Sequence, residues 1–514
     1  MAADTPRAEM KKTLGLTGVT VNAMALIAPG AFLWITYQIQ AAQSLPGSGE
    51  STALDILPGI LFALVLAFLT ALSYSELARV YPEAGTGSCY YFAERSFLDK
   101  ENRAHHRWAR PTKLVTGWAA HLFYWVYPGV MVSFMAILVA YVLSQFGLEI
   151  GTLGQLVIAG LFSIVVGYIA IRGVTGSTTT ALVINVVQLV TLVGFSILAI
   201  SYRFVNPDQA TFVHDGAASV VLPHSLFGML AQSTIAILIL VGFESATAFG
   251  AEAKNAKRDV PRAVILALVI QGLFAYVIEY FAAGFSLSNK LVGTGADGAT
   301  LSGLDAAVAS SAPIGDLIRQ IGDTMLGGLG FPIAIVVAIT VALAILGTTL
   351  SAMNTGVRVT YAIAQDQEMP SVLGALHGRY ATPHWAVGVM VVVSAIIGMA
   401  GTLSVVTLTG ITLASNFGTF VLYALTCFIA FNAFVSRKDF SFVKHGIVPI
   451  LGLVANITML VTIFAMGFVG GGDAATESYI ALAFAGVWGL VAVGYVVTRR
   501  PAARRQPAVE TRSA

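Results

Sequence analysis

Glu244 is an acidic residue near the middle of a long apolar stretch, ILILVGFESATAFGAEAKNAKRDVPRA. An ionisable side chain at the depth of a membrane core is costly and by default marks a substrate or ion pathway. Gly242 and Phe243 precede it, and a glycine allows the backbone to leave the helical conformation. These residues predict an interrupted helix with a polar site at the interruption. The alternative is that Glu244 only caps the interrupted helix by accepting unpaired backbone N–H groups.

A second irregular point lies in the first apolar stretch, MALIAPGAFLW, where Pro29 and Gly30 follow Ala28. Proline removes a backbone donor and glycine removes the side chain that would stiffen the next residue. Inside hydrocarbon, irregular backbone is tolerated only where protein or a water-filled cavity surrounds it. We therefore expect an internal cavity beside this stretch. A simple proline kink, which transmembrane helices also tolerate, is the alternative.

The composition is that of a membrane protein. Of the 514 residues, 57% are apolar and 11% are charged, against roughly 25% charged residues in an average soluble domain. A helix needs about 20 apolar residues to cross the hydrocarbon core. The sequence therefore predicts an all-α integral membrane protein with twelve transmembrane helices. The expected spans are 14–37, 54–79, 114–143, 153–171, 178–202, 225–250, 262–286, 331–362, 384–401, 402–428, 446–469 and 479–498.

The lysines and arginines are distributed unevenly between these spans. If the N-terminus is cytoplasmic and the spans alternate, all of the 28 except Arg203, Lys290 and Arg319 fall on the inner side. This positive-inside bias predicts a multi-pass protein of the cytoplasmic membrane with both termini in the cytoplasm. Residues 1–13 are then a cytoplasmic segment and 499–514 a disordered cytoplasmic tail. A cleavable signal peptide is the alternative for the first stretch, but its length and the eleven spans that follow favour a helix.

The sequence gives little reason to expect an enzyme. It contains no nucleotide-binding, zinc-protease or hydrolase motif, and its two cysteines, Cys89 and Cys427, suggest neither a disulfide framework nor a metal cluster. We expect no cofactor, no bound metal and no catalytic residue, and the net charge of +2 points to no nucleic-acid partner. A membrane enzyme or sensor on a transporter scaffold is the remote alternative to transport.

The two irregular points occupy corresponding positions, because the first and sixth spans are five apart. Paired interrupted helices in two halves of a chain point to the binding site of a transporter. At each interruption, one half-helix offers free N–H groups to a carboxylate and the other offers carbonyls to an ammonium or a cation. The pattern therefore predicts a transporter whose site suits a zwitterion.

Several longer motifs resemble those of a known family. GFESATAFGAEAKNAKRDVPRAV, at residues 242–264, resembles the sixth helix and following loop of the amino acid/polyamine/organocation (APC) superfamily of permeases. Further similar segments are YPEAGTGSCYYFAERSF at 81–97, MNTGVRVTYAIAQDQEMP at 353–370 and YATPHWAV at 380–387. In the first span, Ala28, Pro29 and Gly30 stand where the family usually has Gly-Ser-Gly.

The resemblance implies a five-plus-five inverted repeat, made of 14–202 and 225–428, two further helices in 446–498, and alternating access. It implies that the substrate carboxylate lies near the backbone of 28–30 and the ammonium near carbonyls that precede the breaks. Phe243 matches the family's aromatic gate, and Pro29 lacks a donor that the family usually offers. The substrate-binding residues implied in this way are Leu26, Ala28, Pro29, Gly30, Val241, Gly242, Phe243 and Glu244.

Other polar and aromatic side chains lie within the spans. Phe123 and Tyr127, one turn apart on the third span, lie at the depth where the family lines its site, and core packing is the alternative. We expect His121 to form a hydrogen bond between helices, and Arg358 to anchor the inner end of the eighth span or pair with an acid. Glu279 in the seventh span has no assignment.

The coupling mode depends on Gln188, which stands where many members of the resembled family have a lysine in the fifth helix. An uncharged amide leaves the carbonyls of the first span either hydrogen-bonded or open to a sodium ion completed by Thr348, Thr349 or Ser351. An intramembrane acid such as Glu244 or Glu279 offers a proton route without an assembled cage. We therefore predict transport of amino acids or related amines that is proton-coupled or driven by exchange. Sodium symport and transport of polyamines or other organic cations are the alternatives.

Overall fold

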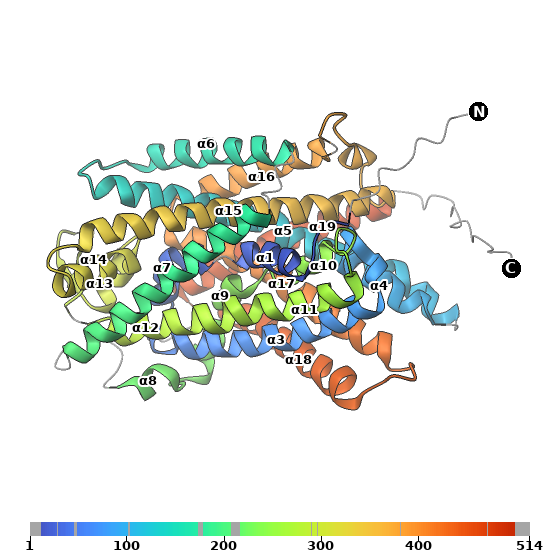
Figure 1. Cartoon of the computed structure of the whole chain (residues 1–514), viewed down its shortest axis with the longest axis horizontal. Helices are drawn as coiled ribbons and strands as arrows, with labels where there is room; N and C mark the ends of the chain where they lie inside the picture. Colours follow the sequence, from blue (N-terminus) through green and yellow to red (C-terminus); the bar gives the residue numbers. More distant parts are fainter. Residues whose placement is uncertain are drawn as a thin grey trace.

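The structure is a computed structural model that describes residues 12–27, 29–45, 49–100, 103–172, 178–206, 216–288, 290–295, 297–380, 382–469 and 471–498. Most of these residues are helical, and the helices lie side by side along the long axis of the molecule (Figure 1). The prediction of an all-α membrane protein is confirmed at this level.

Eleven spans within the described residues are long and apolar enough to cross a membrane, and each overlaps one of the expected stretches. Their helices are η1 (Ala53–Asp55) with α3 (Ile56–Val80), α5 (Arg103–Ser144), α6 (Thr152–Ile171), α7 (Thr178–Val205), α9 (Leu226–Leu240) with α10 (Ser245–Ala248), α11 (Ala256–Leu268) with η3 (Val269–Val277) and α12 (Ile278–Ser286), α15 (Gly330–Gln365), α16 (His384–Gly401), α17 (Val405–Phe434), η5 (Phe442–Ile447) with α18 (Val448–Val469), and α19 (Gly472–Thr498).

The first expected span is described as two helices, α1 (Leu16–Ile27) and α2 (Pro29–Ala42), and Ala28 lies outside the described residues. Because Pro29 has no N–H, the carbonyl of Ala25 cannot receive the usual helical bond from four residues later. Thr348 of α15 donates to that carbonyl instead, at 3.2 Å. α1 is apolar but shorter than a span, so the count of twelve stays a prediction that depends on α1 and α2 crossing together.

The expected interruption of the span at 225–250 is confirmed. α9 ends at Leu240, Val241 is extended, and Gly242 has a φ of +127°, which L side chains rarely adopt. Helical structure resumes at Ser245 for the single turn of α10. Irregular backbone at this depth lies within protein, because Val241, Gly242 and Phe243 are all buried.

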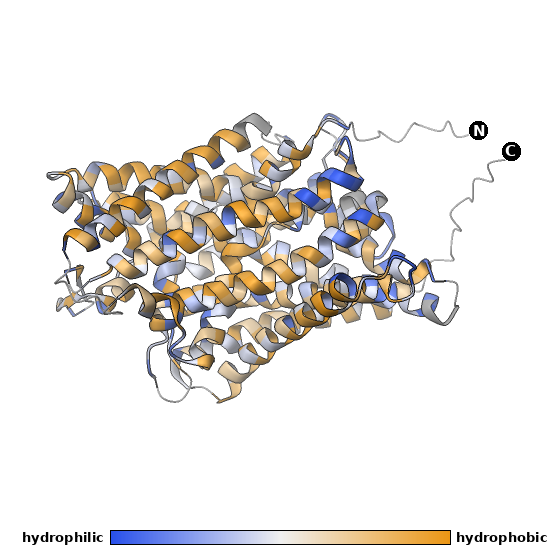
Figure 2. Cartoon of the chain, turned by 60° about the horizontal axis from the view of Figure 1, so that its bottom comes forward, coloured by the Kyte–Doolittle hydropathy of each residue, from blue (hydrophilic) through white to orange (hydrophobic). Residues whose placement is uncertain are grey.

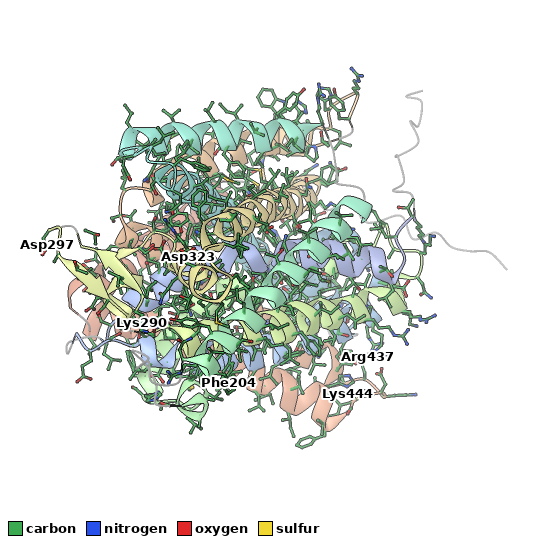
Figure 3. The ribbon with its side chains drawn as sticks, turned by 60° about the vertical axis from the view of Figure 1, so that its left-hand side comes forward. Phe204, Lys290, Asp297, Asp323, Arg437 and Lys444 are labelled. Carbon is green, nitrogen blue, oxygen red and sulfur yellow. The ribbon has the colours of Figure 1, made fainter. Side chains whose placement is uncertain are left out.

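The spans are connected by short elements at the two ends of the bundle. One end carries η2 (Pro82–Gly87), α4 (Cys89–Leu98) and η4 (Ser371–Gly374). The other carries α8 (Ala217–Val221), an antiparallel hairpin of β1 (Val292–Thr294) and β2 (Thr300–Ser302), α13 (Leu304–Ala309) and α14 (Pro313–Met325). Figure 3 shows Lys290 and Asp297 near the hairpin, and Arg437 and Lys444 at the far end, which we call the basic end.

The outer surface of the bundle is apolar. Hydrophobic residues cover most of the helical length and polar residues gather at the basic end (Figure 2). Leu161 of α6, Val190 of α7 and Val493 of α19 are all more than half exposed, as lipid-facing side chains are. Inside the bundle, α5 packs against α15, α16 and α17, and α1 packs against α7, α11 and α15. This arrangement encloses both irregular points.

Candidate functional site

The interruption between α9 and α10 lies directly against the end of α1. A Cβ added to Gly242 would lie 2.9 Å from the backbone nitrogen of Ile27 and 3.0 Å from the carbonyl carbon of Leu26. Only a glycine permits both this approach and the positive φ at this position. Two stretches more than 200 residues apart in sequence are therefore brought into backbone contact, as the transporter hypothesis requires.

Glu244 is bound at this contact by three donors. The backbone N–H of Gly242 donates to Oε2 at 2.9 Å, and the Tyr423 hydroxyl of α17 donates to the same oxygen at 2.8 Å. Tyr124 of α5 donates to Oε1 at 3.0 Å. The side chain is 2% exposed, so these contacts replace water as its solvation. Glu244 both caps the interrupted backbone and joins three helices.

The carbonyl end of α1 also accepts hydrogen bonds from side chains of other helices. Tyr127 of α5 donates to the carbonyl of Leu26 at 3.4 Å, and Tyr276 of η3 donates to that of Ile27 at 2.7 Å. Thr348 binds the preceding carbonyl, as described above. A row of backbone oxygens surrounded by hydroxyl donors is an environment in which an ammonium can replace a hydroxyl.

A cavity of about 400 Å³ lies beside α1, between α7 and α15. It extends from Gln188 and Ala344, at the level of Gly30, to Glu252 and Arg358 near the basic end. The residues that line it are Thr13, Leu14, Asn22, Ala25, Ile169, Ala181, Ile184, Gln188, Phe249, Glu252, Leu343, Ala344, Leu346, Gly347, Leu350, Ser351, Asn354, Thr355 and Arg358. The cavity expected beside the first span is present.

Gln188 lies at the end of this cavity that is farther from the basic end. A Cβ on Gly30 would lie 3.9 Å from Gln188 Cγ and 3.8 Å from Ala344 Cβ, so the second irregular point faces the same space. The Oε1 atom of Gln188 is buried and has no hydrogen-bond partner among the described residues. A buried acceptor without a donor is suited to receive a donor when the neighbouring side chains rearrange around a bound molecule.

Arg358 and Glu252 form an ion pair near the basic end of the cavity. Arg358 Nη2 lies 2.7 Å from Glu252 Oε1, and the guanidinium also lies 4.6 Å from the ring centre of Phe249. The expectation that Arg358 pairs with an acid is confirmed. The backbone carbonyl of Glu252 accepts the N–H groups of Thr13 and Leu14, so the chain before α1 is held to this pair.

Several predicted site residues lie away from this cavity. Phe243 is fully buried and packs against Tyr74 and Tyr423, with ring centres 6.2 and 5.4 Å away. Phe123 packs against Tyr127, at 5.4 Å. Neither phenylalanine lines the described cavity, and their substrate roles stay predictions. Val241 adjoins the contact of Gly242 with α1, whereas Ala28 lies outside the described residues.

The hydroxyls predicted to complete a sodium site are in different surroundings. Thr348 faces α1, Thr349 donates to the carbonyl of Ile345 in its own helix at 2.6 Å, and Ser351 lines the cavity. His121 is bound to Thr360 of α15 at 2.9 Å, which confirms its expected interhelical hydrogen bond. In the described part of the chain, no group of three or more His, Cys, Asp or Glu residues is arranged to hold a metal ion.

The sequence reasoning missed Tyr124, Tyr276 and Tyr423, the tyrosines that bind Glu244 and α1. Each lies in an apolar helix where a tyrosine is common, so its type alone gave no signal. Tyr124 lies between the two singled-out aromatics of the third span, and a buried tyrosine hydroxyl generally needs a partner. That rule, applied to every tyrosine within a span, indicates that each hydroxyl needs a partner, but it does not say which partner.

Comparisons with known proteins agree with this geometry. The amino acid permease family model matches residues 47–510. A low-affinity putrescine importer of Escherichia coli is 24% identical over 286 residues, which are 54% of this chain and about half, 55%, of the importer. A branched-chain amino acid permease of Lactococcus lactis is 25% identical over 65% of this chain and 68% of its own length.

The methylthioribose transporter of Bacillus subtilis is 22% identical over 476 residues, 91% of this chain and 90% of the transporter. The names of these three relatives all describe a transport protein, but each name states a different substrate. A family match over almost the whole chain, together with the apolar spans and the joined helix breaks, leads to one conclusion: the chain belongs to the amino acid permease family, within the APC superfamily.

Proposed function

We propose that this permease is a secondary active transporter that takes up neutral amino acids by alternating access, with a proton gradient or substrate exchange as the driving force. The observation that carries the proposal is the contact between Gly242 and Ile27, and the cavity beside α1 extends from the level of Gly30 toward the basic end. Each interruption presents the carbonyls of one helix end and the N–H groups of the next, and these carry the opposite partial charges that a zwitterion needs.

Alternating access requires two parts that move relative to one another. We infer that residues 14–202 and 225–428 form the two inverted repeats, and that 446–498 are additional. The end of α1 would contribute the carbonyls of Leu26 and Ile27 to the substrate, and the backbone around Gly30 would receive its carboxylate. Since basic loops favour the cytoplasm, the basic end would be the inner one, in the cytoplasmic membrane, with both termini inside.

The charges near the cavity favour a zwitterion over a diamine. Of the described residues that line the cavity, Glu252 and Arg358 are the charged ones, and they pair with each other. Glu244 is already bound by three donors. A dication such as putrescine would need unpaired carboxylates to replace its hydration, whereas a zwitterion needs only the amide, hydroxyl and carbonyl groups described above.

The proposal for the coupling ion rests on the hydrogen bonds at the end of α1. A sodium ion needs several oxygen ligands, and no hydrogen atom can lie between the ion and a ligand oxygen. The Thr348 hydroxyl instead donates its hydrogen to the Ala25 carbonyl, which satisfies that carbonyl without a cation. Buried acids in the spans offer a proton route. Proton coupling or exchange is therefore favoured over sodium symport.

The experiment is uptake into liposomes that contain the purified protein, with radiolabelled L-leucine, putrescine or methylthioribose. We expect leucine to exceed putrescine, accumulation under an inward proton gradient or by counterflow, and no requirement for sodium. Accumulation that needs inward sodium, persists after the proton gradient is collapsed and is lost in Thr348→Ala would contradict the coupling proposal. Preferential uptake of putrescine would contradict the substrate proposal and favour a polyamine transporter.

A further inference from the structure

Glu279 of α12 is a buried acid for which neither the fold nor the site described above provides a partner. Its side chain is 1% exposed, and in the part of the chain that the structure describes both carboxyl oxygens are buried without a hydrogen-bond donor. Buried carboxylates are normally hydrogen-bonded or ion-paired, because an isolated charge loses its hydration on burial. Glu244, in contrast, has three donors. The two intramembrane acids are therefore in chemically different surroundings.

The position of Glu279 connects it to the end of α1. Tyr276, three residues earlier, donates its hydroxyl to the Ile27 carbonyl and lies within electrostatic reach of Glu279. Residues three apart lie on about the same side of a helix. The preceding segment, η3, is a π-helix, an irregularity that is frequent at functional sites. A movement of α1 and α2 relative to η3 and α12 would therefore change the surroundings of Glu279.

The neighbouring titratable groups are tyrosines rather than bases. Tyr280, the next residue, also lies within electrostatic reach of Glu279 and packs on Tyr37 of α2 with ring centres 5.9 Å apart. Its buried hydroxyl has no hydrogen-bond partner from the described segments. Within the described residues, no lysine, arginine or histidine forms an ion pair with Glu279. These surroundings accommodate an uncharged carboxylic acid and penalise a carboxylate.

Charged and titratable groups on the adjoining helices have other partners. On α7, Arg203 lies over the ring of Phe285 at 5.8 Å, and Tyr202 accepts a hydrogen bond from Gln320. At the start of α3, Asp55 accepts the backbone N–H groups of His224 and Ser225.

We propose that Glu279 is the group that binds and releases the coupling proton in each transport cycle. The proposal rests on the proposed function of a proton-coupled transporter and names its proton-binding residue. A proton joins the carboxylate to form a neutral acid, which the described conformation buries. When α2 separates from α12 and water enters, the O–H bond breaks and the proton leaves. Since α12 continues for seven residues beyond Glu279, at about 1.5 Å per residue, the Glu279 backbone lies about 10 Å from the helix end opposite the basic end.

The test compares two kinds of transport by the purified protein in liposomes, with radiolabelled L-leucine, putrescine and methylthioribose as probes. Counterflow at equal pH measures exchange, and an imposed inward proton gradient measures coupled accumulation. Glu279→Gln replaces the acid by an uncharged isostere that imitates the protonated form. We expect counterflow within about twofold of wild type and complete loss of proton-driven accumulation.

Glu477→Gln is the matched control, because Glu477 is also a buried acid of a spanning helix, 4% exposed, but accepts a hydrogen bond from Gln43. This control should retain both activities. Proton-driven accumulation by Glu279→Gln at the wild-type level would overturn the assignment. Loss of counterflow as well would also overturn it, because Glu279 would then be needed for substrate exchange itself. If wild type accumulates none of the probes under a proton gradient but performs counterflow, proton coupling in the proposed function is wrong, and the assignment with it.

Discussion

Tyr423 donates its hydroxyl to Oε2 of Glu244 at 2.8 Å, the same oxygen that accepts the backbone N–H of Gly242. In Glu244→Gln, the amide oxygen can keep both of these donors while the amide nitrogen donates to Tyr124. The fold should therefore tolerate the variant. Hydrogen bonds to a charged group contribute about 1 kcal/mol more than neutral ones. We expect a melting temperature close to wild type and leucine uptake reduced several-fold, measured side by side.

Tyr423→Phe is the companion variant, because it removes one donor and keeps the charge. If Glu244 has a role in the transport cycle, its charge matters and Tyr423→Phe should reduce uptake less than Glu244→Gln does. Normal transport by Glu244→Gln between about pH 5 and 8 would leave Glu244 with the capping role alone.

Gly242 should not tolerate any side chain. Alanine at this position would combine a φ of +127° with a contact of 2.9 Å to the backbone of Ile27. Strain of this kind costs about 1–3 kcal/mol, before the two breaks are pushed apart. We expect Gly242→Ala to lower the melting temperature and to abolish uptake. Gly194→Ala is the control, because Gly194 lies in α7 and no described heavy atom beyond its own helix backbone and chain neighbours lies within 4 Å of an added Cβ. The stability of this variant should equal or exceed that of wild type.

Substitutions of different side-chain volume can distinguish a gating role of Phe243 from a packing role. The ring is fully buried against Tyr74 and Tyr423, so Phe243→Ala should destabilise the protein by about 3–5 kcal/mol. Phe243→Leu keeps most of the volume, and we expect it to remain folded but to transport several-fold more slowly. Phe92→Leu, at a buried phenylalanine of α4, should leave transport unchanged. Wild-type uptake by Phe243→Leu would show that the ring only packs.

The boundary of a span could be predicted from the sequence where a change of residue type marks it. The stretch expected at 384–401 coincides with α16, and the boundary with the next span is set by Ser404, whose side chain accepts the N–H of Thr407 at the start of α17. The last span was predicted to begin at 479, but α19 begins at Gly472. Glu477, an acidic residue, lies in the part of α19 that the prediction left out. The structure buries it beside Gln43, 434 residues away in sequence, which apolar patterning does not reveal.

The candidate site was predictable in its backbone and not in its side-chain partners. Pro29 and Gly242 signalled irregular backbone, because a missing N–H and a tolerance of positive φ are local properties of the residue. The donors to Glu244 come from helices 120 and 179 residues away, and helix packing decides which tyrosines reach it. The direction of Phe243, toward Tyr74 and Tyr423, also depends on packing. A local motif match gives no information about it.

The ion pair between Arg358 and Glu252 should contribute to stability and to transport together. The two side chains are 16% and 22% exposed, so solvent screens the pair only in part. A double-mutant cycle with Arg358→Ala and Glu252→Ala, followed by chemical unfolding, should give a coupling energy of about 0.5–3 kcal/mol. Either single variant leaves one unpaired charge beside the cavity, which should slow leucine uptake. The reversed pair, Arg358→Glu with Glu252→Arg, should restore part of the lost uptake.

Arg379→Ala, at an exposed arginine near the same end, is the control and should change neither the stability nor the uptake. A coupling energy near zero, with normal uptake by both single variants, would mean that the pair is an incidental surface contact and that the cavity end does not depend on it.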